Sequence, residues 1–357
     1  MASLFYKLFP TPALLHVPHV GLDISDDMIR VIQFDTVGAH TKIKFVGERP
    51  LPSGVIDAGY ITNEQALTTE ISSLLKDYNF TYAQVSLPEE KMYVFTLEVS
   101  GTTDEEIRNS IEFHLEENVP IPPSQAVFEY ESIEWKDEVC TKVSVVVFPQ
   151  KTVDTYLTAV ERAGVKVIGF LSQPQAIVRS VVPSHSPHAV LVVHISETKT
   201  SVVVAVDHVI RFSSTIAIGG ASITEAIKKN FSASDAKDSN IQILRQQSLM
   251  DAKKGKEVFG AAMNIFSAIK DEVQKVYSYW QTHSNDNAGI SEIILSGQDV
   301  TLPGLDMYMS SVIKVPTRIA DVWVNSGVGL PVHELEFIKA LDYPAAIGLA
   351  FSSEKIS

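Results

Sequence analysis

Two stretches of the chain follow the same plan: GLDISDDMIRVIQF at residues 21–34 and LVVHISETKTSVVVAV at residues 191–206. Each alternates apolar residues, crosses a short polar cluster and returns to apolar residues, a pattern that predicts strand, tight turn and strand. Aligning Asp23 with His194 carries the apolar positions of one stretch onto those of the other. A self-match at about half the chain length favours a duplicated domain. The sequence therefore predicts two similar lobes, each opening with a hairpin.

The bulk composition describes a globular protein and excludes several classes. The chain has 357 residues, 45% of them hydrophobic and 20% charged, which predicts two or three compact units. A net charge of −14 argues against unaided binding to nucleic acid or an anionic bilayer. The single cysteine, Cys140, excludes an internal disulfide framework and fits a reducing compartment. No stretch approaches the roughly 18 unbroken apolar residues of a membrane span.

The rest of each half alternates helices and strands. One helix is predicted at 102–118, where threonines precede Glu105 and Glu106 in a capping-box pattern. The acids on this helix are interpreted as a solvated face. The order of elements predicts a small α+β insert in the first lobe. We expect an N-terminal segment at 1–19 that packs against the body of the protein or rests on a membrane surface. The first lobe is expected at 20–182, with its insert at about 90–165. The second lobe is expected at 183–357, with its own subdomain at about 221–288.

This order of segments resembles the actin, sugar kinase and chaperone ATPase superfamily, whose five sequence landmarks all have counterparts here. The two hairpins resemble its phosphate-binding hairpins. The segments SQPQA at 172–176 and YPAAIGL at 343–349 resemble its two interlobe connectors, and ILSGQ at 294–298 resembles its adenosine motif. In the second connector, small residues let two helices cross closely.

Within that superfamily the chain is similar to the PilM family of type IV pilus assembly proteins. The similarity covers about 20–352, and its motifs are LPSGVIDAG, EENVPIPPSQAVFEYE, IGGASIT and LPGL at 51–59, 116–131, 218–224 and 302–305. The resemblance implies an α/β protein with duplicated actin-like, ribonuclease H-like lobes. It also implies an insert subdomain of the FtsA/PilM type in the first lobe.

The resemblance also implies partners and a location. PilM-like proteins lie on the cytoplasmic face of the inner membrane. They hold the N-terminal tail of a single-span partner, PilN, in a groove between the insert and the first lobe. The sequence is therefore interpreted as a cytoplasmic scaffold that is peripheral to the inner membrane and contacts the pilus motor complex. Weak self-association stays open. The alternatives are an active actin-like ATPase and the cytoplasmic subunit of a type II secretion system, which normally continues into a membrane span.

The family also implies ATP with Mg in the cleft between the lobes. The candidate contacts are Asp23, Ser25, Asp26, Arg30, Ser196, Thr198, Lys199, Thr200, Gly219, Gly220, Gly297 and Gln298. Asp23 would hold the metal through water, and Gln173 would be the residue that orients water. Lys199 is the cation best placed in either hairpin.

Several residues depart from the family pattern at this cleft. Ser25 replaces a glycine, and Asp26 and Asp27 replace small hydroxyl residues. At about 5 Å and a dielectric constant of about 20, each carboxylate facing a phosphate would cost about 3 kcal/mol. Gln173 stands in place of a glutamate, and an amide orients water but cannot deprotonate it. We therefore expect no ATP hydrolysis and leave ATP binding without turnover as an open alternative.

Four histidines close in sequence raise the alternative of a metal site. Their spacing does not place two on one helix face, and no cysteine or carboxylate cluster joins them. We interpret them as ordinary histidines: His185, His188, His194 and His208.

Overall fold

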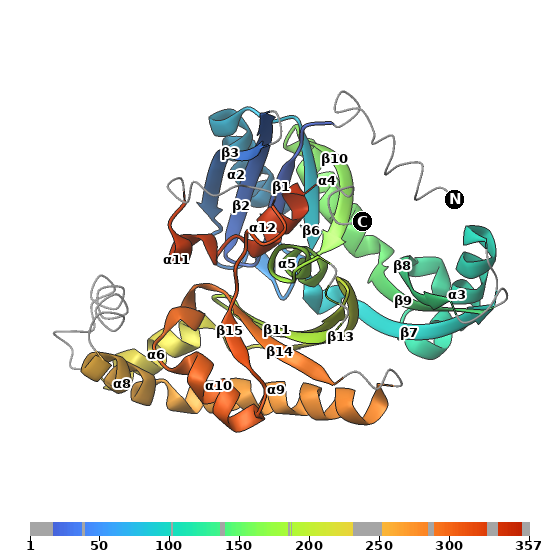
Figure 1. Ribbon diagram of the computed structural model, residues 1–357. Helices are drawn as coiled ribbons and strands as arrows, with labels where there is room; N and C mark the ends of the chain where they lie inside the picture. Colours follow the sequence, from blue (N-terminus) through green and yellow to red (C-terminus); the bar gives the residue numbers. More distant parts are fainter. Residues whose placement is uncertain are drawn as a thin grey trace.

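The computed structural model describes residues 17–37, 40–100, 103–135, 140–184, 186, 188–230, 252–284, 289–326 and 335–351. Two five-stranded sheets form its centre, with helices on their outer sides and a smaller three-stranded sheet beside them (Figure 1). Most of the predicted N-terminal segment, 1–19, lies outside the described residues, as does the middle of the predicted subdomain at 221–288. Within the described ranges, no helix combines the length and the apolar character needed to cross a bilayer.

The first sheet has the strand order β10-β6-β1-β2-β3. Strands β1 to β3 form an antiparallel meander, and β6 and β10 run parallel to β1 on its other side. Alternating apolar residues of β1 and β2 are buried in the core of this lobe, as the period-two pattern predicts. The strands are β1 Val20–Ile24, β2 Met28–Val37, β3 His40–Pro50, β6 Tyr82–Leu87 and β10 Lys166–Ser172.

The second sheet repeats this topology with the order β13-β12-β11-β14-β15. Its first three strands are again an antiparallel meander, followed by parallel strands on the other side of β11. The strands are β11 Ala189–Ile195, β12 Thr200–Val206, β13 Val209–Ile216, β14 Ile290–Ser296 and β15 Thr317–Ile319.

The two hairpins also share their register and their turn. Asp23 faces Arg30 across the first hairpin, and His194 faces Ser201 across the second. In the first turn the Ser25 amide donates to the carbonyl of Met28 at 2.9 Å; the Ser196 amide makes the matching 2.9 Å bond to Lys199 in the second. The predicted duplication is therefore confirmed down to the individual hydrogen bond.

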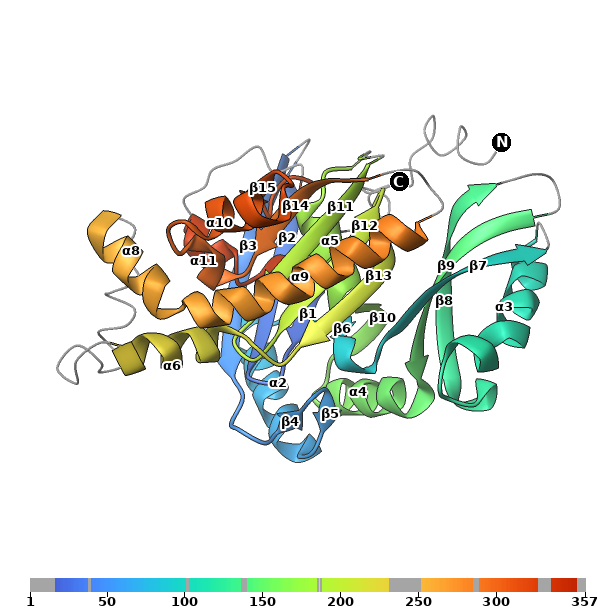
Figure 2. The same ribbon diagram turned by 90° about the horizontal axis from the view of Figure 1, so that it is seen from below.

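The insert is a sheet of order β7-β9-β8 with one helix, α3, on its outer face (Figure 2). Ile107, Ile111 and Leu115 lie on one stripe of α3 and are buried against this sheet. The predicted capping box is present: Thr103 accepts from the Glu106 amide, and Glu106 accepts from the Thr103 amide. The elements are η2 Glu89–Lys91, β7 Tyr93–Ser100, α3 Asp104–Asn118, η3 Pro123–Gln125, β8 Ala126–Trp135 and β9 Cys140–Pro149.

Helix α4, Gln150–Arg162, follows the insert and belongs by its packing to the first lobe. Its buried face, which includes Tyr156 and Val160, joins the core of the first lobe. There α4 lies beside α2, Glu64–Tyr78, where the hydroxyl of Thr68 donates to the Ala159 carbonyl at 3.3 Å. Of the range 90–165, residues 93–149 therefore carry the separate small core.

Two helices cross between the lobes: α5, Gln173–Val181, and α12, Pro344–Ala350 (Figure 1). A Cβ placed on Gly348 would lie 1.8 Å from the carbonyl oxygen of Ala176. Only glycine permits this approach of two backbones, so the close crossing predicted from the second connector is confirmed.

Four further helices belong to the second lobe. Helices α6, α9 and α10 lie on the side of the second sheet away from the first lobe, and α8 packs against α6 and α9 at the end of that lobe (Figure 1). Their bounds, with those of the short elements, are α6 Gly220–Asn230, α8 Ala252–Ala261, α9 Met263–His283, α10 Leu305–Ile313, α11 Phe337–Ala340, η4 Gln298–Thr301, β4 Ile56–Asp57 and β5 Tyr60–Ile61.

Candidate functional site: an interlobe cleft and a groove beside the insert

Three buried side chains from different elements meet in the cleft between the lobes. Asp23 stands near the end of β1, Gln173 begins α5, and Lys199 lies in the turn between β11 and β12. The Gln173 amide donates to the Asp23 carboxylate at 3.0 Å, and the Lys199 ammonium donates to the amide oxygen of Gln173 at 3.2 Å. The predicted candidates of both lobes are thus joined through the connector helix.

Lys199 continues across the cleft to the first lobe. Its Nζ lies 2.7 Å from Glu90 Oε1 and 3.5 Å from Glu89 Oε1, in η2. Lys199 is 8% exposed and Glu89 6% exposed, so most of this contact is screened from solvent. Burial opposes the charged ammonium, but the two glutamates outweigh it and raise the pKa of Lys199 above its ordinary value. We call this contact the interlobe ion pair.

The acids of the first hairpin turn away from each other. The Asp26 carboxylate accepts from the amides of Ala58 at 3.1 Å and Gly59 at 3.2 Å. Burial, and then the charge of Glu90, raise the pKa of Asp26. Asp27 instead lies 3.1 Å from the Ser25 hydroxyl, whose single hydrogen is shared between Asp27 and the Met28 carbonyl.

The hydroxyl groups of both hairpins are used inside their own turns. Ser25 donates to the carbonyl of Met28 at 2.9 Å, and Ser196 donates to the carbonyl of Lys199 at 3.0 Å. Thr200 is fully buried and donates to the Ile218 carbonyl at 2.6 Å. These three candidates hold the hairpins in shape.

The glycine pair at the start of α6 packs directly on the second hairpin. A Cβ on Gly219 would lie 2.4 Å from the Ser196 carbonyl oxygen, and one on Gly220 would lie 2.1 Å from an oxygen of Asp299. The Gly220 amide donates to Ser196 at 2.8 Å, and the next amide of the helix donates to the Glu197 carbonyl at 2.9 Å. Two of the N-terminal amides of α6 are therefore bonded to the hairpin.

The other candidates line two cavities of the cleft. Arg30, Ser196, Gly297 and Gln298 line a cavity of about 350 Å³ between the first hairpin and the loop after β14. Thr198 lines a larger cavity of about 980 Å³, whose lining includes the three residues of the interlobe ion pair. The acids that line the smaller cavity are Asp27, Glu197, Asp299 and Asp342. Those that line the larger cavity are Asp26, Asp27, Asp57, Glu89 and Glu90.

A triphosphate placed between the hairpins would meet this charge distribution directly. Its anionic oxygens would compete with Glu89 and Glu90 for Lys199 and would face further carboxylates on both sides. In the described part of the chain, no three His, Cys, Asp or Glu side chains gather as metal ligands. His185 lies outside the described residues, while His194 accepts or donates a hydrogen bond with Ser296 at 3.3 Å.

Sequence reasoning missed Glu89 and Glu90, although a signal was present. Strand β6 runs parallel to β1, so its C-terminal end meets the same edge of the sheet as Asp23. Side chains that directly follow such a strand reach the cleft at that edge. The pair LPEEK at 87–91 stands at that position.

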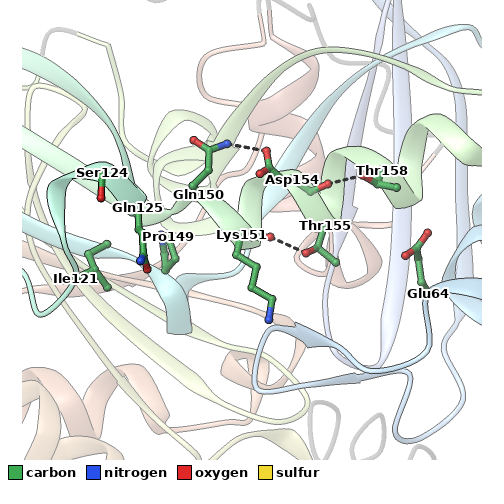
Figure 3. A pocket seen from close by; sticks show the side chains of 10 residues that line it. All are labelled: Glu64, Ile121, Ser124, Gln125, Pro149, Gln150, Lys151, Asp154, Thr155 and Thr158. Carbon is green, nitrogen blue, oxygen red and sulfur yellow. Dashed lines mark hydrogen bonds between the residues drawn. The ribbon is translucent and has the colours of Figure 1, made fainter.

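A third cavity lies outside the cleft, between the insert and the first lobe, and we call it the insert groove. Its volume is about 480 Å³, within the range of roughly 300–1,000 Å³ typical of ligand pockets. One wall comes from the segment between α3 and β8, the other from α4 and the start of α2 (Figure 3). The lining residues are Glu64, Ile121, Ser124, Gln125, Pro149, Gln150, Lys151, Asp154, Thr155 and Thr158.

The insert groove combines two apolar residues, Ile121 and Pro149, with polar groups that can form further hydrogen bonds. The hydroxyls of Thr155 and Thr158 donate to helix carbonyls, which leaves their oxygens able to accept. Gln150 donates to Asp154 at 2.6 Å, whereas Lys151 extends away from that pair (Figure 3). Among the described residues, no carboxylate forms an ion pair with Lys151.

The chain resembles type IV pilus proteins over nearly its whole length. A family model described as type IV pilus assembly protein PilM matches residues 21–354. A solved PilM–PilN type IV pilus biogenesis complex is similar at 18% identity, with a TM-score of 0.77, over 96% of this chain and 99% of that chain.

Two more solved structures share the fold at lower similarity. The ethanolamine utilization protein EutJ from Carboxydothermus hydrogenoformans is 12% identical, with a TM-score of 0.54, over 96% of this chain and 90% of that chain. MreB5 of Spiroplasma citri bound to ADP is 12% identical, with a TM-score of 0.50, over 86% of this chain and 93% of that chain. The actin-like fold predicted from the five landmarks is therefore confirmed.

Proposed function

The chain belongs to the PilM family of type IV pilus assembly proteins, and from that premise we propose that it is a cytoplasmic scaffold peripheral to the inner membrane. In this proposal it holds the N-terminal cytoplasmic tail of a PilN-like, single-span membrane protein in the insert groove. Among the known proteins, a PilM–PilN complex is similar over nearly the whole of this chain. The match of the family model favours pilus assembly over the type II secretion alternative.

The observation that carries the proposal is the insert groove itself. Its walls belong to two separately packed cores, that of the insert and that of the first lobe, so the cavity lies at the boundary between two structural units. Three prolines restrict the backbone of its walls: Pro122, Pro123 and Pro149. A wall that is already ordered loses little conformational freedom on binding, which favours capture of a short tail.

The lining fits a peptide in an extended conformation. Ile121 and Pro149 offer apolar contact, while the oxygens of Thr155 and Thr158 accept hydrogen bonds from peptide amides. Such a short tail gains affinity from main-chain hydrogen bonds and specificity from its side chains.

The test is a binding titration with a fluorescent peptide that copies the N-terminal tail of the PilN-like protein of the same organism. Thr158→Trp would fill the groove from a half-buried position, and we expect it to weaken binding about tenfold or more. Glu161→Trp is the matched control, because Glu161 is exposed on the same helix and does not line the groove. Equal affinities for all three proteins would remove the groove from the proposal.

We further propose that the scaffold works without ATP turnover and binds nucleotide weakly or not at all. Support comes from Lys199, which pairs with Glu89 and Glu90, and from Gln173, which lacks the carboxylate that would deprotonate water. Calorimetric titration with ATP and Mg, together with a phosphate-release assay, tests this. Micromolar binding with steady phosphate release would favour the active ATPase instead.

A further inference from the structure

The insert carries most of the net charge of the chain. Between residues 93 and 149 there are twelve Asp and Glu residues and three Lys and Arg residues, so this segment holds −9 of the total −14. Much of this charge is on α3, whose outer face is solvent-exposed at the end of the molecule opposite α8 (Figures 1 and 2).

Phe113 stands in the middle of that charged face. It is 79% exposed, the highest value among the large apolar side chains of the described residues. Glu116 and Glu117 follow it by three and four positions, which makes them its neighbours on the helix surface, and Glu112 is adjacent to it. All three glutamates are exposed, and within the described ranges none forms an ion pair. We call Glu112, Phe113, Glu116 and Glu117 the α3 face.

The position of these acids works against the helix that carries them. Carboxylates in the last turn of a helix face the negative end of its dipole, and α3 has no basic residue there. Glu112 and Glu116 are also like charges four residues apart, which destabilises a helix. Helix stability therefore does not account for this arrangement, whereas a positively charged partner would remove both repulsions.

The α3 face is continuous along the chain with the insert groove. Helix α3 ends at Asn118, and the residues that follow it, beginning with Ile121, form one wall of the groove. A tail that leaves the groove on this side therefore reaches the last turn of α3 first. This step rests on the proposed function, because it takes the groove as the site of the tail.

The membrane-proximal part of such a partner has a predictable chemistry. Cytoplasmic segments next to a membrane span carry an excess of Lys and Arg. We propose that the basic segment between the tail and the span of the partner lies on the α3 face, with its cations on the glutamates and an Arg or apolar side chain over Phe113. The pairing would also shield the acidic insert from the anionic surface of the membrane.

The experiment compares three fluorescent peptides on the full chain at 50 mM and 300 mM NaCl. One peptide is the partner's tail alone, the second is its whole cytoplasmic segment, and the third is that segment with each Lys and Arg replaced by Gln. We expect the whole segment to bind about tenfold more tightly than its Gln version at low salt. At high salt we expect the advantage to shrink to about threefold or less.

Two variants assign that advantage to α3. The triple variant E112Q/E116Q/E117Q is expected to abolish the advantage, and Phe113→Ser to reduce it several-fold, while the affinity for the tail alone stays unchanged. The matched control E161Q/D321N/E336Q removes three exposed acids elsewhere and is expected to retain it.

The outcomes separate this inference from the proposed function. If the tail alone binds but the α3 variants keep the full advantage, the inference fails and the groove stands. If the tail alone does not bind, the groove assignment fails, and the whole segment against its Gln version still tests the α3 face. If the α3 variants instead change the sedimentation of the protein by itself, the face belongs to a second copy of the chain and the assignment to the partner is overturned.

Discussion

Replacement of Lys199 by methionine should destabilise the protein by about 3–5 kcal/mol at pH 7. Methionine keeps much of the volume of the side chain but leaves two glutamates without their cation. With 2.7 Å to Glu90 and 3.5 Å to Glu89, the two attractions amount to roughly 6 and 5 kcal/mol at a dielectric constant of about 20, before the cost of desolvating the ammonium. The expected loss is smaller than their sum because that cost disappears with the charge.

The stability deficit of Lys199→Met should depend on pH. Burial raises the pKa of Glu89 above its ordinary value, and loss of Lys199 raises it further. A carboxyl group with a raised pKa in the folded state stabilises the fold below its unfolded pKa, and this stability is lost as the pH rises through the folded pKa. The deficit of Lys199→Met should therefore be large at pH 8 and small near pH 4.

Urea unfolding from pH 4 to pH 8 measures the effect, since urea adds no ions that would screen the charges. The triple variant K199M/E89Q/E90Q is the control. It removes all three charges and should return to within about 1 kcal/mol of the original stability. A deficit below about 1 kcal/mol at pH 7, with no dependence on pH, would refute the role given to the interlobe ion pair.

Three further predictions concern the connectors, the second hairpin and the insert. Gly348→Val should lower the melting temperature by more than about 8 °C, because its Cβ would lie 1.8 Å from Ala176 O; Gly289→Val, with open space around it, should not, and equal shifts would contradict this. Burial, then neighbouring cations, lower the pKa of His194 to about 3, so the free energy of unfolding should fall as the pH drops from about 6.5 to 3. In urea unfolding, His194→Gln should lose about 1–3 kcal/mol less than the original protein between pH 7 and pH 4. An unchanged pH profile would contradict this. Thr103→Ala removes the capping box and should cost about 1 kcal/mol in urea, whereas no change would mean that α3 does not depend on its cap.

The parts of the fold that could be predicted from the sequence rest on local patterns. The hairpins alternate apolar and polar residues over short distances, so their strands, turns and even common register follow from the aligned sequences. The crossing of the connectors follows from small residues, with Gly348 against Ala176 as its closest point. The capping box of α3 likewise involves only Thr103 and Glu106, which lie close together in the sequence.

The rest depends on contacts between distant segments. Lys199 and Glu90 are bonded although they lie 109 positions apart in the sequence. A pattern of neighbouring residues does not show which distant residues form such a pair. The hairpin pattern places Lys199 in the cleft, but it does not reveal that Glu89 and Glu90 are its partners. The insert groove is built from three separated segments, so its lining emerges only when the insert and the first lobe are packed together.

The two halves of the chain differ between the last two parallel strands of each sheet. Between β6 and β10 the first half carries the whole insert, whereas between β14 and β15, where every residue is described, the second half has only η4 and α10. Within the described residues the insert therefore forms one insert groove, and if that groove takes the tail, one chain binds one tail. The number of chains in a larger assembly would then be determined by the number of membrane partners in it.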